Sequence, residues 1–461
     1  MSTLRVRWTR ALSPGAWIIL ATAVVTSLVV ALLPVHPPSG TQLWTFLDTS
    51  VKQYQPVFDR WNAAHPGEHV TVQQIEYSSL QRRMLGGFFA GTPTADLIEI
   101  ERNMASRAFV GPLDQVGFVD LTDWVREAGL REEIPAAVFT PWTTRGRVFG
   151  IPIGAHPVLL CYRADLAEAA GIDVSGIETW DDYFRVMKPL MADRDGDGRP
   201  DRYLISGWNT NGGFLDMVML QADAKLFDEA GRPTLDTPRN AEILARLVGW
   251  FAGPNRVAAD ASDYTPAGNR QRIEGYVVGT LMPDWLAGAW KRDLPQLAGK
   301  VKLMPVPAWE RGGRRTSAWG GTMIGIARTA PRPTEKWELI KSLYYSRELA
   351  AQNYHDAMIV SPLRSFRSLP FYQEPEPYFC GQRTGQMFLA QTDAMPARPS
   401  SPFFPEAHLH IIGVLTALKE YAESIGRYDA ATLQPKAREL LAEAQVRFVR
   451  QVERNPFLVT P

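Results

Sequence analysis

The sequence predicts an α/β protein with mainly parallel sheets, and three observations carry that prediction. Short apolar segments alternate with segments of helical periodicity over the first hundred residues and again after residue 150. Strand-helix-strand order of this kind forms parallel sheets with right-handed crossovers. The composition, with 45% apolar and 21% charged residues over 461 positions, is ordinary for globular proteins. It excludes collagen, whole-chain disorder and multi-span membrane proteins, and the length allows roughly two to four domains.

The first α/β segment runs from residue 42 to residue 100. Strands are expected at 42–47, 70–72 and 95–100, and helices at 51–61 and 80–88. Because ligands of parallel sheets bind beyond the carboxyl ends of the strands, residues near those ends are candidates for a binding site. The candidates from this segment are Trp44, Tyr77, Glu101 and Asn103.

A second α/β segment begins near Gly150. Thr179 is expected to cap a helix that starts with acidic residues. Further strands are expected at 158–162, 276–282 and 323–327, and further helices at 164–170, 240–251, 336–345, 408–421 and 432–452.

The first 40 residues have the layout of an export segment. Arg5, Arg7 and Arg10 precede an uncharged stretch from Ala16 to Leu33, which is a basic flank followed by an apolar core. That stretch is long for a signal peptide and just long enough to cross a bilayer. A cleaved signal and an uncleaved anchor with membrane contact therefore both stay open, and either places the body in the periplasm or at the cell surface.

Charge and cysteine content narrow the classes of partner. Lys and Arg number 49, as do Asp and Glu. A chain with zero net charge lacks the footprint of nucleic-acid binding, so we expect no nucleic-acid partner. The only cysteines, Cys161 and Cys380, are too few for a disulfide-dense scaffold. Their pairing is left open, although a buried free thiol is the simpler reading of Cys161 within its apolar run.

Several motifs, taken in order, resemble family 1 extracellular solute-binding proteins, the sugar receptors of ABC importers that include maltose-binding protein. The opening lobe is similar in FDRWNAAHPGEHVTVQQIEY and FFAGTPTADLIEI. The hinge crossing is similar in VFGIPIGAHPVLLCYRADLAEAAGID and the following TWDDYFRVMKPL, and later segments in GTLMPDWLAGAW and SAWGGTMIGIA. The ordered set covers residues 41 to about 450 and is more specific than any one motif.

The resemblance implies a two-lobe periplasmic-binding-protein fold of type II, each lobe a mainly parallel sheet flanked by helices, with hinge crossings between lobes that close on a solute. Residues 1–40 would be the signal or anchor, residues 41–151 plus 318–362 lobe one, and residues 152–317 plus 363–461 lobe two. The crossings are expected near Ile151–His156, Ser317–Gly321 and Ile359–Arg364.

The resemblance also implies a function. We expect a receptor that binds a sugar or oligosaccharide between its lobes and delivers it, as a monomer, to the membrane subunits of an ABC permease. A membrane-anchored solute sensor and a receptor for a non-sugar polar solute are the alternatives. A glycoside hydrolase would also use Trp and carboxylates, but we expect no enzyme because the chain lacks G-x-S-x-G, H-E-x-x-H, P-loop and G-x-G-x-x-G motifs.

Fourteen tryptophans favour a sugar ligand. Aromatic rings cover the apolar faces of sugars, and polar groups bind the hydroxyl edges. The further ligand-binding candidates are His156, Trp208, Asp284, Trp285, Trp319, Gly320 and Arg364. Core packing is the alternative for each ring, and a surface ion pair for Arg364. The acidic side chains of Glu99 and Glu101 leave open a ligand with amino groups.

One motif has the spacing of a metal site. The segment DRDGDGRPD matches the start of a calcium loop, D-x-D-x-D-G. Its expected ligands are Asp193, Asp195, Asp197 and Asp201. Position twelve is Leu204 rather than the bidentate Glu, so we expect a shortened loop with a structural Ca²⁺, against the alternative of a polar turn without metal. No catalytic cofactor is expected.

Overall fold

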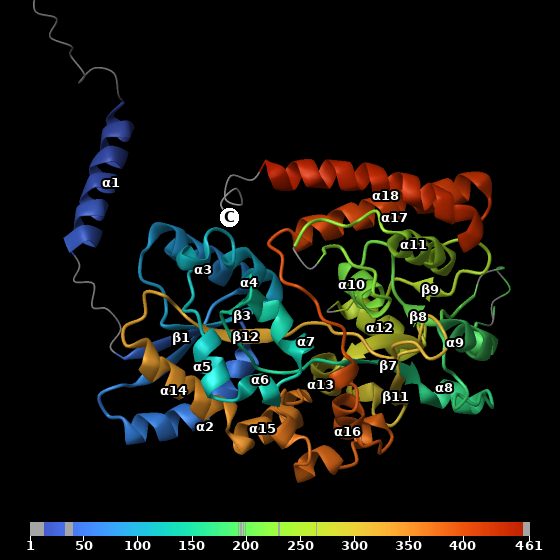
Figure 1. Ribbon diagram of the computed structural model, residues 1–461, viewed down its shortest axis with the longest axis horizontal. Coiled ribbons are helices and arrows are strands. Elements are labelled where there is room, and N and C mark those ends of the chain that lie inside the picture. The colour runs from blue at the N-terminus through green and yellow to red at the C-terminus, as the bar shows by residue number, and fades with distance from the viewer. Residues whose placement is uncertain are drawn as a thin grey trace, which may run out of the picture. The chain divides into compact units, whose positions relative to one another are not determined.

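The computed structural model describes residues 13–32, 40–191, 193, 196, 198, 200–228, 231–263 and 265–454. The chain divides into two compact units, Met1–Gly40 and Thr41–Pro461 (Figure 1).

The first unit contains the helix α1 (Pro14–Leu32), whose 19 residues include no charged side chain. Among the residues that the structure describes, no helix combines the length and the apolar character needed to cross a bilayer. The predicted export segment also includes residues 1–12 and 33–39, which lie outside the described residues. Whether residues 1–40 are a cleaved signal peptide or an uncleaved membrane anchor therefore stays a prediction.

The second unit is built on two sheets, and the sheet of the first lobe has five strands in the order β2-β1-β3-β12-β6. β1 pairs in parallel with β2 and β3, as predicted, whereas β12 runs antiparallel to both β3 and β6. The strands are β1 (Thr41–Thr45), β2 (Val70–Gln74), β3 (Leu97–Glu101), β6 (Ile151–Pro152) and β12 (Thr322–Ile326).

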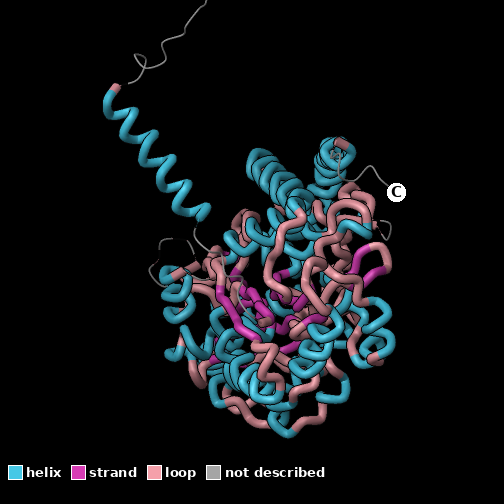
Figure 2. The backbone as a smooth tube through the Cα atoms, turned by 90° about the vertical axis from the view of Figure 1, so that its left-hand side faces the viewer, coloured by secondary structure: helices cyan, strands magenta, loops and turns pink. Residues whose placement is uncertain are grey.

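The helices of the first lobe lie around this sheet, and Figure 2 shows the strands in the interior with helices outside them. They are α2 (Asp48–Ala64), α3 (Tyr77–Ala90), α4 (Arg102–Ala108), α5 (Thr122–Glu127), α6 (Leu130–Glu133), α7 (Ala136–Phe139), α14 (Pro333–Tyr344) and α15 (Arg347–Ala357). The short strands β4 (Thr143–Thr144) and β5 (Arg147–Val148) pair with each other.

Local sequence explains where α3 begins and ends. The carboxylate of Glu76 accepts hydrogen bonds from the backbone N–H groups of Ser78 and Ser79 at 2.8 and 2.9 Å, which satisfies donors that have no partner within the helix. Gly91 ends the helix with a φ of 62°, a conformation that glycine adopts without steric cost. Tyr77 is thereby held in the first turn of α3, just beyond the carboxyl end of β2.

The sheet of the second lobe is centred on β7 (Val158–Arg163), whose six residues are all buried. Both neighbours, β10 (Gly279–Pro283) and β11 (Val301–Pro305), run antiparallel to it. The expected parallel pairing is found in this lobe only for the short strands β8 (Ile205–Ser206) and β9 (Ala258–Ala259), as far as the described strands go. β10 and β11 reach β7 after long excursions of the chain, so no single strand-helix-strand unit fixes their direction.

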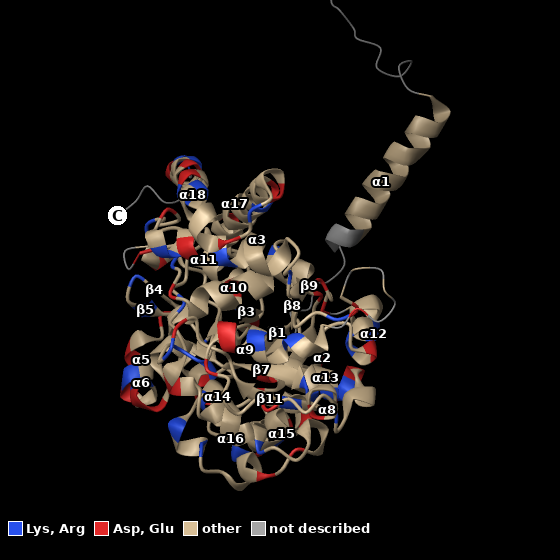
Figure 3. Cartoon of the chain, turned by 90° about the vertical axis from the view of Figure 1, so that its right-hand side faces the viewer, with Lys and Arg blue, Asp and Glu red and all other residues tan. Residues whose placement is uncertain are grey.

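Helices cover the second lobe, and three of them, α11, α17 and α18, pack side by side (Figure 1). Basic and acidic residues are interspersed along α17 and α18 (Figure 3), as the zero net charge suggests. Apart from α14 and α15 of the first lobe, the helices after β7 are α8 (Ala164–Ala169), α9 (Trp180–Met187), α10 (Gly212–Gln221), α11 (Pro238–Phe251), α12 (Pro266–Glu274), α13 (Asp284–Asp293), α16 (Thr384–Leu389), α17 (Phe404–Ile425) and α18 (Ala430–Glu453).

The three predicted crossing segments lie beside one another. The backbone N–H of Ala155 donates to the carbonyl of Val360 at 3.2 Å, and that of Val158 donates to the carbonyl of Ser317 at 3.1 Å. Side chains of α13 and α16, such as Leu286 and Phe388, join the core cluster that contains the first sheet. The residue limits of the two lobes stay a prediction.

Candidate functional site

A hollow of about 500 Å³, here called the inter-lobe cleft, is lined by residues of α3 and α4 of the first lobe and of α10 and α17 of the second. Its volume is within the range of small-molecule sites. Its lining residues are Tyr77, Gln81, Arg102, Asn103, Arg107, Gly212, Gly213, Asp216, Trp319, Arg398, Phe404, Pro405, His408, Leu409 and Ile412.

Trp319 lies where this cleft meets a second hollow. The adjoining hollow measures about 320 Å³ and is lined by Trp319 together with five polar residues, Thr210, Asn211, Asp260, Ser262 and Asp263. An indole that lines both hollows is suited to cover the face of a sugar ring while polar side chains on either side bind its hydroxyls.

Two contacts hold Trp319 in place. The indole Nε1 of Trp285 donates to the carbonyl of Trp319 at 3.0 Å, and the two ring systems are 5.0 Å apart at an interplanar angle of 48°. Gly320 has a φ of 83° and approaches Trp285 so closely that a Cβ there would lie 2.5 Å from Nε1. Trp285 and Gly320 therefore position Trp319, and neither of them is among the lining residues of the cleft.

Tyr77, Glu101 and Asn103 form a group at the first-lobe wall. The hydroxyl of Tyr77 donates to Glu101 Oε2 at 3.1 Å, and the same oxygen accepts from the backbone N–H of Asn103 at 2.7 Å. Burial and the Glu101 carboxylate raise the pKa of Tyr77 above its ordinary value, so the phenol stays protonated and able to donate. Tyr77 and Asn103 line the cleft, and Glu101, which is not among the lining residues, holds the Tyr77 hydroxyl and the Asn103 backbone.

Glu99 does not reach the cleft. Its buried carboxylate accepts from the hydroxyls of Thr45 at 2.8 Å, Ser50 at 3.2 Å and Thr322 at 3.0 Å. Burial raises the pKa of Glu99, and the hydroxyl donors oppose that shift. Glu99 is a core residue, so it gives no support to a ligand with amino groups.

His156 and Asp284 were expected to bind the ligand, but they lie in the buried junction between the crossings. His156 Nδ1 and Asp284 Oδ1 are 2.8 Å apart. Oδ1 also accepts from the backbone N–H of Trp285 at 2.7 Å, and Oδ2 accepts from that of Val360 at 3.0 Å. Both carboxylate oxygens are therefore used to hold the junction, and neither side chain lines either hollow as the described residues form them.

Three other candidates also lie outside the two hollows. Trp44 is half-buried against the first-lobe core. Trp208 packs against the second-lobe core, with the cations of Arg256 and Lys419 at 5.6 and 5.7 Å from its ring. Arg364 makes a surface ion pair, with Nη2 at 2.8 Å from Asp393 Oδ1, which was the alternative expected for it.

The charged residues at the floor of the cleft, Arg102, Asp216 and Arg398, were not predicted from the sequence. Asp216 of α10 accepts a hydrogen bond from Arg102 of α4, and its Oδ2 lies 3.5 Å from Nη1 of Arg398. Burial alone would raise the pKa of Asp216, but the two guanidinium groups outweigh burial and lower it. An acidic residue inside the apolar run GGFLDMVML of α10 was the one signal that pointed to this cluster.

The predicted calcium loop is only partly described. Asp193 Oδ1 accepts from the backbone N–H of Gly196 at 2.7 Å, and Oδ2 from that of Gly198 at 2.9 Å. Asp195 and Asp197 lie outside the described residues. Within the described residues no three His, Cys, Asp or Glu side chains cluster as metal ligands would.

Cys161 and Cys380 are free thiols. Burial raises the pKa of the Cys161 thiol above its ordinary value, as expected for an inert thiol inside an apolar strand.

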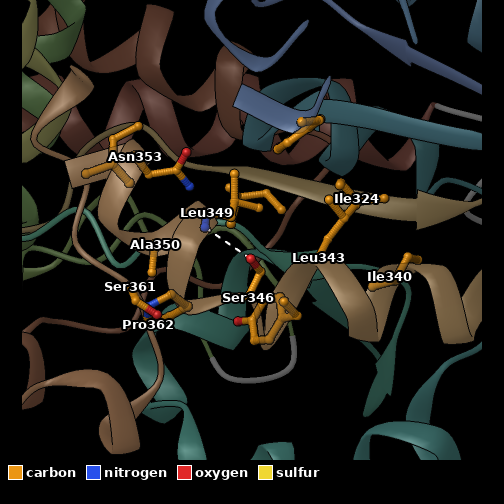
Figure 4. Close-up of a pocket in the computed structure, with 13 residues that line it drawn as sticks. Ile324, Ile340, Leu343, Ser346, Leu349, Ala350, Asn353, Ser361 and Pro362 are labelled. Atoms are coloured by element: carbon orange, nitrogen blue, oxygen red, sulfur yellow. Dashed lines mark hydrogen bonds between the residues drawn. The ribbon is translucent and has the colours of Figure 1, made fainter. Parts of the chain in front are cut away.

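A smaller cavity inside the first lobe is unsuited to a sugar. It measures about 30 Å³ and is lined mostly by apolar side chains of β12, α14 and α15, far below the size of small-molecule sites. Figure 4 shows Asn353 and Ser346 at its edge, with the Ser346 hydroxyl accepting from the backbone N–H of Leu349 at 3.1 Å.

Known proteins resemble this chain in sequence and in fold. The arabinooligosaccharide-binding protein of Halalkalibacterium halodurans is 27% identical over 290 residues, which are 60% of this chain and 61% of that protein. The arabinooligosaccharide-binding protein of Bacillus subtilis is 25% identical over 70% of this chain and 73% of its own length. The chain thus spans about three fifths of the first relative and nearly three quarters of the second.

Solved structures share the fold at lower identity. The sugar-binding protein MalE of Xanthomonas citri has a TM-score of 0.69 at 18% identity, covering 89% of this chain and 99% of that one. A binding protein of B. animalis subsp. lactis in complex with β-1,6-galactobiose has a TM-score of 0.63 at 16% identity, covering 90% and 98%. These likenesses confirm the two-lobe fold. The sequence profile of the bacterial extracellular solute-binding protein family matches residues 48–344, and the chain belongs to that family.

Proposed function

We propose that the chain is an extracytoplasmic receptor that binds a sugar or oligosaccharide in the inter-lobe cleft and delivers it to an ABC-type permease. The observation that carries the proposal is Trp319, an indole that lines both the inter-lobe cleft and the adjoining polar hollow. The two curated relatives are named for arabinooligosaccharides, and one similar structure holds β-1,6-galactobiose. The name of the two relatives and the ligand of the similar structure both support a sugar as the solute class.

In this proposal the protein binds by closing. The solute stacks on Trp319, while Tyr77 and Asn103 of the first lobe bind its hydroxyls. The crossings are the hinge, because the His156–Asp284 contact fixes their junction while the lobes on either side can rotate. A solute favours closure only by the difference between its contacts in the closed and open forms. No bond of the solute is made or broken.

Delivery and location follow from the same proposal. The closed form docks on the membrane subunits of a permease, which recognise the paired lobes rather than the solute. The protein acts outside the cytoplasm, with residues 1–40 as its export signal or anchor. A membrane-anchored sensor would bind in the same way but pass its closed shape to a signalling partner.

We also propose a structural Ca²⁺ in the Asp193–Asp201 loop. The backbone hydrogen bonds from Gly196 and Gly198 to Asp193 support this proposal, and three further carboxylates follow Asp193 in sequence. External calcium at millimolar concentration fills even a weak site of this kind. Thermal unfolding of the protein and of Asp195→Asn, each with and without Ca²⁺, tests this: the proposal requires a calcium-dependent rise in Tm that the variant lacks.

The solute proposal is tested by a thermal-shift screen of residues 41–461 against mono- and oligosaccharides. A ligand that binds only the folded state stabilises it by mass action, so one class of sugar should raise Tm. Isothermal titration then gives the affinity. A rise with amino acids or polyols and none with any sugar would favour a non-sugar polar solute and overturn the proposal.

A further inference from the structure

The floor of the inter-lobe cleft holds two buried guanidinium groups that share one buried carboxylate. Arg102 and Arg398 have side chains only 7% and 8% exposed, and the carboxylate between them, Asp216, is 6% exposed. Arg107 also lines the cleft, and Glu101 lies 3.4 Å from Arg102 Nε. Glu101 is partly exposed and Arg107 is exposed, so among the described residues at this floor the two buried guanidinium groups share one buried carboxylate, that of Asp216.

Arg398 is the less well paired of the two buried arginines. Its Nη1 is 3.5 Å from Asp216 Oδ2, and its Nη2 is 3.5 Å from Asn103 Oδ1. Both distances are well beyond the roughly 2.7–2.9 Å of a charge-assisted hydrogen bond. Asp216 Oδ2 is already bound by Arg102, so the planar fork of Arg398 has no carboxylate of its own.

Three buried polar nitrogens of the cleft lack a hydrogen bond altogether within the described part of the chain. They are Nε of Arg102, Nη1 of Arg398 and Nε2 of His408. A buried donor without an acceptor is costly, and an incompletely paired buried charge more so. Burial and the neighbouring Arg102 lower the pKa of Arg398 to about 9, in spite of Asp216. An anion at this place would offer acceptors to the guanidinium nitrogens of Arg102 and Arg398.

We propose that the solute is an acidic saccharide, and that its carboxylate binds the guanidinium groups of Arg398 and Arg102 at the floor of the cleft. A carboxylate has two coplanar oxygens that match the planar guanidinium fork. Its single negative charge would give Arg398 the carboxylate that it lacks, whereas a phosphate would carry close to two charges. This inference rests on the proposed function, since it adds a charge to the sugar proposed there.

The adjoining hollow favours one orientation of the saccharide in the cleft. Asp260 and Asp263 line it on the far side of Trp319, and Asp263 is paired with Arg272 at 2.5 Å. Asp260 would repel a carboxylate but can accept hydrogen bonds from sugar hydroxyls. With its uronic acid unit at the arginines, the saccharide therefore places a neutral unit beyond Trp319.

The test compares pairs of sugars that differ only in a carboxylate. Isothermal titration measures glucuronate against glucose, galacturonate against galactose, and α-1,4-digalacturonate against its neutral counterpart, with glucose 1-phosphate as a phosphate probe. We expect at least one uronate to bind about tenfold tighter than its neutral partner or better. Equal or tighter binding of the neutral partners overturns the inference but leaves the sugar receptor standing.

The other outcomes are also distinct. Tighter binding of the phosphate sugar than of any uronate would overturn the carboxylate assignment. If no saccharide of either charge binds, in these pairs or in the wider sugar screen, the proposed function fails and this inference fails with it.

Variants of two arginines, one at the cleft floor and one at the surface, separate a binding role from a structural one. Arg398→Met should remove the preference for the uronate, and Arg398→Lys should retain part of it. Arg364→Met, which deletes an exposed guanidinium paired with Asp393, should leave the preference unchanged. Circular dichroism and Tm of each variant report whether it is folded. A folded Arg398→Met protein with the full preference would contradict the proposal.

Discussion

Trp319 owes its place to two residues distant in the sequence and to the glycine that follows it. Trp285 holds its backbone carbonyl, and Gly213 lets its ring come close to α10, where a Cβ would lie 2.4 Å from the indole. The following residue, Gly320, adopts a φ of 83°, which turns the chain into β12. A bulky aromatic side chain held in this way is already ordered before a ligand arrives, so little conformational entropy is lost on binding.

The first prediction is that Trp319→Ala weakens binding of the sugar by roughly 10- to 100-fold, because removal of a stacking indole loses about 1–3 kcal/mol of contact. Isothermal titration measures the loss. Trp61→Ala is the matched control, since Trp61 stacks on His65 at the end of α2 and lines neither hollow. An unchanged dissociation constant in Trp319→Ala would remove this ring from the site.

A second residue-scale prediction concerns Glu99. Its pKa is raised above 4.5 in the folded protein, so between the unfolded and the folded pKa the native state binds more protons than the unfolded state. The stabilisation from the neutral carboxyl is complete below the unfolded pKa and is lost as pH rises through the folded pKa. Glu99→Gln should therefore show a flatter dependence of unfolding free energy on pH above about 4.5 than the wild type.

Urea unfolding at a series of pH values from 4 upward measures that dependence. The amide keeps the size of the side chain, and the surrounding hydroxyls of Thr45, Ser50 and Thr322 can reverse their hydrogen bonds to it. Glu348→Gln, an exposed change, serves as the comparison. The same pH slope in wild type and Glu99→Gln would show that Glu99 does not titrate with folding.

At the scale of elements, α10 connects the core of the second lobe with the cleft. Leu215 and Val218 of this helix are fully buried, while Gly212, Gly213 and Asp216 face the cleft. We predict that Gly213→Ala lowers sugar affinity by about tenfold, because the new methyl group displaces the Trp319 ring and overpacking of this kind costs about 1–3 kcal/mol.

The control for this change is Gly413→Ala on α17, where a Cβ meets no atom within 4 Å. It should leave affinity unchanged and keep or slightly raise stability, since alanine favours a helix over glycine. Isothermal titration gives the sugar affinity of each variant, and urea unfolding gives its free energy of unfolding. Wild-type affinity in Gly213→Ala would mean that the ring can move without loss of the ligand.

Elements were predicted more completely than the site, and the residues show why. Strands and helices leave local periodic patterns, so Thr179 was identified as a cap and the structure has it in a capping box with Asp182. The site depends on contacts between distant residues. Arg398 lies 295 positions from Asn103 and Asp216 lies 114 from Arg102, and no local pattern brings such residues together. Trp319 was proposed because a Gly-Gly turn beside a tryptophan is visible locally, and Trp285 because it follows an apolar strand and an acidic residue; the structure has only Trp319 among the lining residues of the cleft.

At the scale of the whole molecule, the Arg102–Asp216 pair joins α4 of one lobe to α10 of the other. It is one of the contacts that favour approach of the lobes before any solute is bound. Because both side chains are buried, breaking the pair without moving the lobes would leave two guanidinium groups with no carboxylate between them, and the loss of one partner of a buried pair costs about 3–5 kcal/mol. Opening of the lobes avoids that cost by exposing the arginines to water.

We therefore predict that Asp216→Asn opens the ligand-free protein. Small-angle X-ray scattering should give a larger radius of gyration for the variant than for the wild type at the same concentration. Asp223→Asn is the control, since Asp223 pairs with Arg314 near the surface of the second lobe and should leave the radius unchanged. An acidic saccharide should bring Asp216→Asn back toward the compact form, because its carboxylate supplies the negative charge that the variant lacks. A variant that scatters like the wild type without ligand would show that this pair does not govern the separation of the lobes.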